Sequence, residues 1–238
     1  MSTVKKKEIR CIGAIIPAYN ESEAIAAVVK KVRQYVSRVV VIDDGSCDQT
    51  AQVAEQAGAS IIIHKRNRGK GIAIKNGFDD MCTRGVDAVI ILDGDGQHDP
   101  GEIPHFVQVA NELNADIVLG NRMVDPQGMP FLRFATNKVT SLIISKIIGA
   151  SIKDTQCGYR LLRSWILPQL RLETSRYDTE TEMLLQAGIM RAQFENIQIK
   201  SIYQNQKSEI RKFRDTVKFL KLIGLSILKK YQQKKAVS

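Results

Sequence analysis

Asp93 and Asp95 follow the apolar run at residues 88–92 and are separated by one glycine. Alternate residues at the end of a strand point to the same side, so both carboxylates can be aimed at one point. Gly94 and Gly96 keep side-chain bulk away from that point. Carboxylate oxygens at a rigid edge are typical ligands of Mg²⁺ or Mn²⁺, which complete their coordination with phosphate oxygens. A single D-x-D pattern is more often a polar turn, because short motifs have low specificity.

Three earlier apolar runs are also followed by polar motifs. The motifs read P-A-Y-N-E at 17–21, D-D-G-S-C-D-Q-T at 43–50 and N-R-G-K-G-I-A at 67–73. They supply carboxylates, the aromatic ring of Tyr19 and a cationic glycine loop around Lys70, which together could hold a nucleobase, ribose hydroxyls and a diphosphate with its divalent ion. Each motif alone is more often a turn. Their occurrence after successive runs favours a nucleotide site, in which Asp44 could hold a base edge or a ribose hydroxyl.

The elements that must position these motifs alternate over the first 120 residues. Short runs rich in Val and Ile predict strands at 12–16, 39–42, 60–63, 88–92 and 117–119. The segments between them predict helices at 22–35, 49–57, 71–83 and 102–113, with Asp48 as a cap of the second. This alternation predicts an α/β fold, a mostly parallel sheet with helices on both faces. Ligands on such sheets gather at the carboxyl ends of the strands, where every motif falls.

The regular alternation fades after about residue 123. Residues 131–149 form a long mixed segment, and the stretch 139–152 is apolar apart from Lys146 and a few small residues. This stretch is too short to span a bilayer; it could lie on a bilayer surface or pack on the domain as an amphipathic helix, and both interpretations stay open. Residues 179–190 and 213–231 predict helices, and 194–203 a strand.

Composition indicates one domain with a sizeable core: 238 residues, 44% hydrophobic and 25% charged. The four cysteines show no C-x-x-C spacing, so we expect reduced, mostly buried thiols in a cytoplasmic protein. No signal peptide and no apolar stretch of about 18 residues is present, so we expect no integral membrane span.

The net charge of +10 is concentrated at the C-terminus, where residues 207–238 hold ten Lys or Arg against two acidic residues. Such a tail favours polyanions, either nucleic acid or an anionic membrane surface, or only aids solubility. We expect no nucleic-acid binding, because the charges are not interleaved with aromatic residues and no recognition motif is present.

The ordered set P-x-Y-N-E, D-D-G-S-x-D-x-T, G-K-G-x-A and D-x-D-x-Q-H resembles the family 2 glycosyltransferases with the GT-A fold. Within them it is most similar to dolichyl-phosphate mannose synthase and the bacterial polyprenyl-phosphate sugar transferases. The resemblance covers roughly residues 11–205. It implies a catalytic domain at 1–205 and a basic C-terminal helix and tail at 206–238.

The resemblance also implies roles for single residues. Asp93, Asp95 and Gln97 would ligate the metal, Mg²⁺ or Mn²⁺, on the donor diphosphate. The nucleotide sugar would contact residues at the strand ends and one lysine of a shortened 203–208 segment: Pro17, Tyr19, Glu21, Asp44, Asp48, Lys70, Asp93, Gly94 and Lys207.

The acceptor's phosphate would be received by Arg122, in a G-x-R motif, and by Arg133, with Asn137 four residues later. A guanidinium fork suits a phosphate, although either arginine could instead form a surface ion pair. Asp154 opens a D-x-x-x-G-[FY]-R element that shapes the sugar end of the pocket. Glu180 belongs to the acidic start of the next helix.

The function implied is transfer of a sugar from GDP-mannose or a UDP-hexose to polyprenyl (dolichyl or undecaprenyl) phosphate, by metal-dependent inverting displacement. A lipid phosphate is already ionised, so it needs orientation and charge rather than a strong base. The alternative acceptor, a saccharide hydroxyl, requires a base such as Asp154, Glu180 or Glu182. We expect contact with the cytoplasmic face of a membrane to be peripheral or to run through a membrane-anchoring partner.

Other functions fit less well. A nucleotidyltransferase usually begins with G-x-G-T-R, where this chain has P-A-Y-N-E. The Q-x-x-R-W element of processive polysaccharide synthases is absent from the sequence. A nucleic-acid-binding protein and an inactive scaffold that keeps the fold remain the alternatives of another class.

Overall fold

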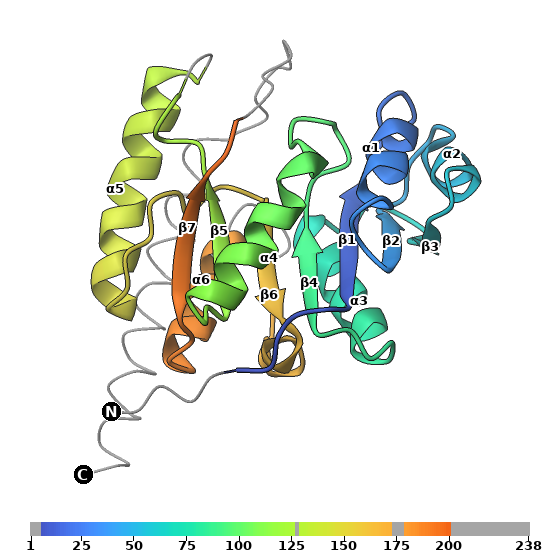
Figure 1. Ribbon diagram of the computed structural model, residues 1–238. Coiled ribbons are helices and arrows are strands. Elements are labelled where there is room, and N and C mark those ends of the chain that lie inside the picture. The colour runs from blue at the N-terminus through green and yellow to red at the C-terminus, as the bar shows by residue number, and fades with distance from the viewer. Residues whose placement is uncertain (1–5, 127–128, 173–178, 201–238) are drawn as a thin grey trace.

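Short segments rich in Val and Ile form a seven-stranded sheet. A computed structural model of the chain describes residues 6–126, 129–172 and 179–200 (Figure 1). The strand order is β3-β2-β1-β4-β6-β5-β7. The bounds are β1 (Ile12–Ala18), β2 (Arg38–Asp43), β3 (Ser60–Ile63), β4 (Ala88–Ile91), β5 (Ile117–Asn121), β6 (Arg160–Arg163) and β7 (Phe194–Gln198).

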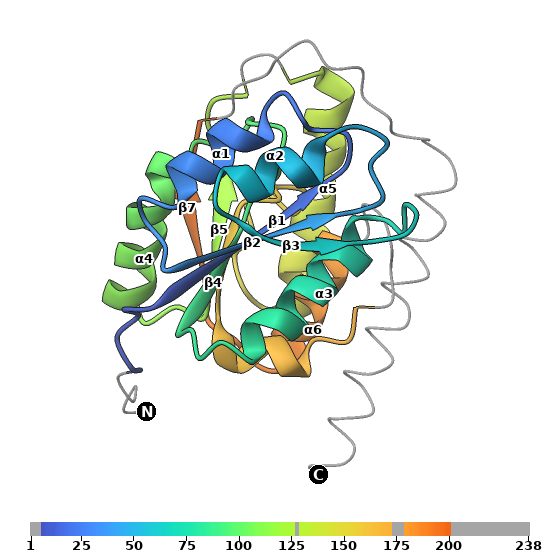
Figure 2. The same ribbon diagram turned by 90° about the vertical axis from the view of Figure 1, so that its right-hand side faces the viewer.

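Helices cover both faces of this sheet (Figure 2). They are α1 (Ile25–Val32), α2 (Thr50–Gln56), α3 (Lys70–Cys82), α4 (Ile103–Glu112), α5 (Phe131–Ile148) and α6 (Thr179–Ile189), with 3₁₀ turns at Pro100–Glu102 and Ser164–Gln169. β1, β2, β3 and β4 pair in parallel, as do β5 and β7. The predicted α/β class with a mostly parallel sheet is therefore confirmed.

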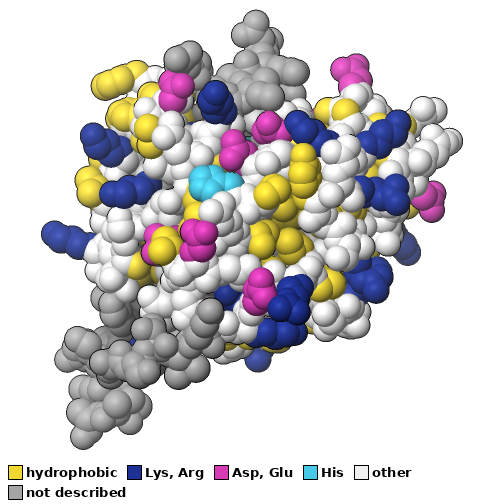
Figure 3. Space-filling view, viewed as in Figure 1, with side chains coloured by type: hydrophobic (Ala, Val, Ile, Leu, Met, Phe, Trp, Pro, Cys, Tyr) yellow, Lys and Arg dark blue, Asp and Glu magenta, His cyan; other side chains and the backbone are white. Residues whose placement is uncertain are grey.

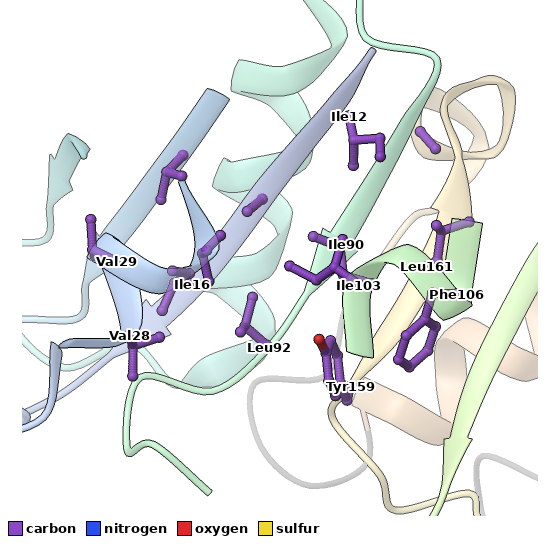
Figure 4. Close-up of a cluster of buried hydrophobic side chains, with 14 of the residues drawn as sticks. Ile12, Ile16, Val28, Val29, Ile90, Leu92, Ile103, Phe106, Tyr159 and Leu161 are labelled. Carbon is purple, nitrogen blue, oxygen red and sulfur yellow. The ribbon is translucent and has the colours of Figure 1, made fainter. Parts of the chain in front are cut away.

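The sheet separates two hydrophobic cores. On one face α1, α2 and α4 pack against the strands, and Figure 4 shows Ile103 and Phe106 of α4 beside Tyr159 and Leu161. The Phe106 and Tyr159 ring centroids lie 4.5 Å apart. On the other face α3, α5 and α6 contribute side chains such as Phe78 to a second core. With both faces covered, β1, β4 and β5 are buried along their whole length, which fixes the strand ends firmly.

β6 is the strand that the sequence did not predict. It runs antiparallel between β4 and β5. Its four residues begin and end with arginine, which hides the usual strand pattern. Both arginines are buried because backbone carbonyls satisfy them: Arg160 donates to Cys157, Glu180 and Thr155, and Arg163 donates to Ala115, Lys7 and Ala110.

Other differences from the sequence predictions are small. Most helices begin or end one to three residues inside the predicted bounds, as the observed α1 at Ile25–Val32 illustrates. The expectation of mostly buried cysteines was wrong, since Cys47 and Cys82 are exposed, Cys11 is half-buried and Cys157 alone is buried; all four are free thiols. In the described residues no helix has the length and apolarity to cross a bilayer. The predicted helix at 213–231 lies outside the described residues.

Candidate active site

Hydrogen bonds join the loops that follow β1 and β2 at the carboxyl edge of the sheet. The Glu21 N–H donates to Thr50 Oγ1 at 2.8 Å, and the Ser22 N–H donates to Asp48 Oδ2 at 3.2 Å. Asp48 is exposed, and the small loss of hydration that works to raise its pKa is outweighed by hydrogen bonds from Thr50 and Ser22, which lower that pKa to about 2. Pro17 is buried in β1 and Tyr19 beside it is exposed, so its ring is available for stacking.

Asp44 anchors the glycine loop that follows β3. It is buried, and it accepts hydrogen bonds from the backbone N–H groups of Arg68 at 2.9 Å and Gly69 at 2.7 Å. His64 Nδ1 lies 2.6 Å from Asp44 Oδ1, and Asn76 Nδ2 lies 2.8 Å from His64 Nε2. These bonds hold the start of α3, where Lys70 is the first residue. A direct contact between Asp44 and a nucleotide stays a prediction.

Lys70 joins two acidic side chains from distant segments. Its Nζ lies 2.6 Å from Asp93 Oδ1 and 2.9 Å from Glu180 Oε1. Burial would lower the pKa of Lys70, but the charges of Asp93 and Glu180 raise it well above its usual value, so the ammonium stays charged. Gly158 packs against this pair: a Cβ there would lie 2.8 Å from Lys70 Nζ and 2.8 Å from Asp93 Oδ2. A larger residue at position 158 would have to displace the Lys70 ammonium or the Asp93 carboxylate.

Asp93 and Asp95 are the carboxylates that could hold a divalent cation. Burial, followed by the charge of Asp93, raises the pKa of Asp95, so a cation there would relieve unfavourable charge. Mg²⁺ is usually held by one or two carboxylates and substrate phosphates, so this pair fits. Among the described residues no group of three or more His, Cys, Asp or Glu side chains forms a protein-only site. The Gln97 N–H donates to Asp95 Oδ1 at 3.0 Å.

The turn that carries Asp93 and Asp95 is held by packing against β1 and α1 and by the buried ring of His98. Gly94 sits close to β1 and α1, since a Cβ there would lie 3.2 Å from Ala18 Cβ and 3.1 Å from Ile25 Cδ1. His98 is buried, and burial lowers its pKa to about 4, so it is neutral at pH 7. Its ring stacks on Tyr159 with centroids 5.1 Å apart. His98 therefore supports the turn from inside the protein.

Arg122, Asn137 and Asp154 form one buried polar network. Arg122 makes a two-pronged ion pair with Asp154, with Nε 2.8 Å from Oδ2 and Nη2 3.0 Å from Oδ1. Asn137 Nδ2 donates to Asp154 Oδ1 at 2.7 Å. Burial would raise the pKa of Asp154, but the bonds from Arg122 outweigh it and lower that pKa. The network ties β5 and α5 to the loop that follows α5.

The predicted site residues thus fall into two groups. One group lies at the ends of β1, β2 and β4 and the start of α3 and includes the Lys70–Asp93 ion pair; the other is the network of Arg122, Asn137 and Asp154. Arg133 belongs to the first turn of α5, and its Nε is buried without a hydrogen-bond partner in the described part of the chain. Lys207 lies outside the described residues. His64 was not predicted as a site residue, because no local pattern marks it.

Glu21 makes a pH-dependent contribution to the stability of the folded protein. Burial, followed by the charges of Asp95 and Asp93, raises the pKa of Glu21 from 4.5 to about 7. A carboxyl with a raised folded-state pKa binds its proton more tightly when folded, so its contribution to stability falls as pH rises from 4.5 to 7.

Replacing Glu21 by glutamine removes this cost. We expect Glu21→Gln to be more stable than wild type by about 1 kcal/mol near pH 8, a value reduced for partial exposure, and equal to it near pH 4. Urea unfolding at both pH values measures the difference. If the stability difference between Glu21→Gln and wild type were the same at pH 4 and pH 8, the raised pKa of Glu21 would be contradicted.

Comparison with known proteins identifies the family of the chain. The family model "Glycosyl transferase family 2" matches residues 14–170. The UDP-N-acetylglucosamine–dolichyl-phosphate N-acetylglucosaminyltransferase of Methanococcus voltae is 28% identical over 217 residues, covering 82% of this chain and 86% of that one. The polyprenol monophosphomannose synthase of Mycolicibacterium smegmatis is 31% identical over 170 residues, covering 66% of this chain and 63% of that one.

A solved structure shares the fold. Glucosyl-3-phosphoglycerate synthase from Mycobacterium tuberculosis, crystallised with Mn²⁺, UDP and glucosyl-3-phosphoglycerate, superposes with a TM-score of 0.69 at 17% identity and covers 93% of this chain and 80% of its own. At that identity the likeness shows the fold alone. From the family model, which matches well over half of the sequence, the chain belongs to glycosyl transferase family 2 and is a glycosyltransferase with the GT-A fold.

Proposed function

We propose that this glycosyltransferase moves a hexose from a nucleotide-diphosphate sugar to a polyprenyl phosphate, with inversion at the anomeric carbon. The observation that carries the proposal is the grouping of Asp93, Asp95 and Lys70 at the carboxyl edge of the sheet. The two relatives above, named for transfer to dolichyl phosphate and for polyprenol monophosphomannose synthesis, support the lipid acceptor.

The donor would lie across the strand ends. Tyr19 would stack on the base, and Lys70, charged and beside Asp93, would contact the phosphates. A divalent cation bound by Asp93 and Asp95 would neutralise the charge that grows on the departing nucleoside diphosphate. The donor would be GDP-mannose or a UDP-hexose, and the cation Mg²⁺ or Mn²⁺.

The contacts of two candidate bases favour a phosphate acceptor over a saccharide hydroxyl. Asp154 is held by Arg122, and Glu180 Oε1 is 2.9 Å from Lys70, while Glu180 Oε2 is buried without a hydrogen-bond partner among the described residues. A base that must take a proton from a hydroxyl needs a free carboxylate within hydrogen-bond reach. A phosphate needs only positive charge and orientation, which Arg133 would supply through its unpartnered Nε. The reaction would take place at the cytoplasmic face of a membrane, with the protein bound peripherally.

A thermal-shift screen tests the donor. Incubation with UDP- and GDP-sugars should raise the melting temperature by about 5–10 °C for the true donor at a hundredfold excess over its Kd, and only when Mn²⁺ or Mg²⁺ is present. The expected dependence on metal follows from the charge at Asp93 and Asp95. A shift of the same size with chelator present would remove the cation from the proposal.

Arg133→Ala should chiefly harm use of the acceptor. Loss of a charged hydrogen bond to a phosphate should raise the KM for polyprenyl phosphate by about 10–100-fold and leave the donor KM within about twofold. Steady-state kinetics with varied acceptor measure both. Arg38→Ala is the matched control, because Arg38 is exposed at the amino end of β2, away from the carboxyl ends of the strands where the site lies. Equal acceptor KM values for both variants would place Arg133 outside the site.

A further inference from the structure

α5 is amphipathic, but unlike an ordinary surface helix it buries its polar side and exposes its apolar side. Its buried face carries the polar residues Asn137, Thr140 and Ser141 together with Ile144. Its solvent-facing side carries large apolar side chains with high exposed fractions: Phe131 83%, Leu132 57%, Val139 57%, Leu142 64% and Ile143 36%. A helix that only covered a soluble domain would bury these side chains and expose the polar ones.

The exposed apolar residues form one continuous stripe, here called the α5 face. At about 100° per residue, Phe131, Leu132, Val139, Leu142 and Ile143 lie within one side of the helix, and the exposed Lys138 and Lys146 lie on the same side. Figure 3 shows hydrophobic and basic side chains interspersed along the edge of the molecule where α5 runs.

The fold does not need the α5 face, because the buried polar side of the helix is satisfied inside the protein. The Thr155 N–H donates to Ser141 Oγ at 3.1 Å, Thr155 Oγ1 donates to Asn137 Oδ1 at 3.1 Å, and Asn137 donates to Asp154. Within the described part of the chain, the side chains of α5 that face outward remain exposed and can bind a partner.

The two lysines of the α5 face, Lys138 and Lys146, indicate what kind of partner binds it. Lys146 lies within the stripe rather than at its border, and lysine is depleted in the desolvated core of protein–protein interfaces. On a bilayer its long stem can lie along acyl chains while the ammonium reaches the headgroups. We propose that the α5 face docks on a membrane containing anionic lipids, with its apolar side chains among the acyl chains and Lys138 and Lys146 at the headgroups.

The position of the helix links this surface to the active site, a step that rests on the proposed function. Arg133 is in the first turn of α5, and Asn137 in the next turn reaches the Arg122–Asp154 network. With the α5 face on the bilayer, Arg133 would lie near the level at which a lipid phosphate is presented. Docking would thus bring the acceptor to the site without a membrane-spanning segment.

Vesicle flotation with the full-length chain tests the proposal. The variant Val139→Ser/Leu142→Ser removes two exposed apolar side chains from the α5 face. The control Ile63→Ser/Leu113→Ser removes two that are 65% and 58% exposed elsewhere on the surface. We expect the first variant to bind phosphatidylcholine–phosphatidylglycerol vesicles at least about tenfold more weakly than wild type, since each buried aliphatic side chain contributes about 1.5–3 kcal/mol. The control should bind like wild type.

Donor-induced thermal shifts, measured on the same proteins, separate this proposal from the proposed function. If both variants respond to donor and metal and the α5 variant also binds vesicles like wild type, membrane docking by α5 is wrong while the function stands. If the α5 variant loses vesicle binding and no protein responds to any donor, docking stands without the function. Wild type that is a dimer by light scattering, with a monomeric α5 variant and no vesicle binding, would make a second copy the occupant and overturn the proposal.

Discussion

Replacing Asp95 by asparagine is expected to lower the rate of sugar transfer by about a thousandfold, because a bound divalent cation contributes several kcal/mol of charge stabilisation and each 1.4 kcal/mol is tenfold in rate. The fold should be kept or even stabilised. Burial and the charge of Asp93 raise the pKa of Asp95, so its ionised form is costly in the folded state. Asparagine removes that charge and keeps an oxygen for the Gln97 N–H.

The measurement is kcat with donor and acceptor in excess, together with the melting temperature of each protein. Asp99→Asn is the matched control, because Asp99 lies four residues further along the same turn, pairs with Lys31 and is half-exposed. It should keep transfer within about threefold, as expected for a surface ion pair. Near-wild-type turnover by Asp95→Asn in the presence of chelator would remove the cation from the mechanism.

Asp154→Ala is expected to have the largest effect on stability, a loss of about 3–5 kcal/mol in the free energy of unfolding. Removing one partner of a buried ion pair leaves the other charge without compensation. Arg122 would lose both prongs of its pair, and Asn137 would lose an acceptor. Chemical denaturation at pH 7 measures the loss.

A double variant separates the cost of the stranded charge from the cost of the cavity. Arg122→Leu/Asp154→Leu removes both charges, and replacing a buried pair by apolar residues is often close to neutral. We therefore expect it to be more stable than Asp154→Ala. A loss below about 1 kcal/mol in Asp154→Ala would mean that water reaches the pair, which the near-zero exposure of Asp154 argues against.

The sequence predicted the sheet well where a strand was a plain apolar run. β1 to β5 and β7 fall where short Val- and Ile-rich segments indicated strands. Burial on both faces makes such strands nearly continuous in apolar residues, so the pattern is strong. β6 was missed because its end residues are charged, and only the tertiary structure supplies the carbonyls that accept from them.

The candidate site was predictable as motifs but not as contacts. The sequence placed Asp93, Asp95 and Lys70 at strand or loop ends, which the structure confirms. It could not show that Lys70 would bridge Asp93 and Glu180, residues 23 and 110 positions away, because such pairing is set by the packing of α3 and α6. His64 likewise supports Asp44 through a contact that no local pattern encodes.

α5 shows the same limit. The sequence left membrane contact and packing on the domain as equal interpretations of residues 131–149, since periodicity does not reveal which side faces inward. The structure resolves the packing: the polar side of α5 is buried and the apolar side is exposed.

Mass spectrometry of the lipid product tests most directly whether this chain transfers a sugar to a polyprenyl phosphate. The purified chain is incubated with Mn²⁺, the nucleotide sugar selected by thermal shift, and vesicles that contain undecaprenyl or dolichyl phosphate. We expect a new lipid heavier than the acceptor by one sugar residue, formed by wild type and absent with chelator or with Asp95→Asn. Donor consumption without a glycosylated lipid, or an equal yield from Asp95→Asn, would contradict this expectation.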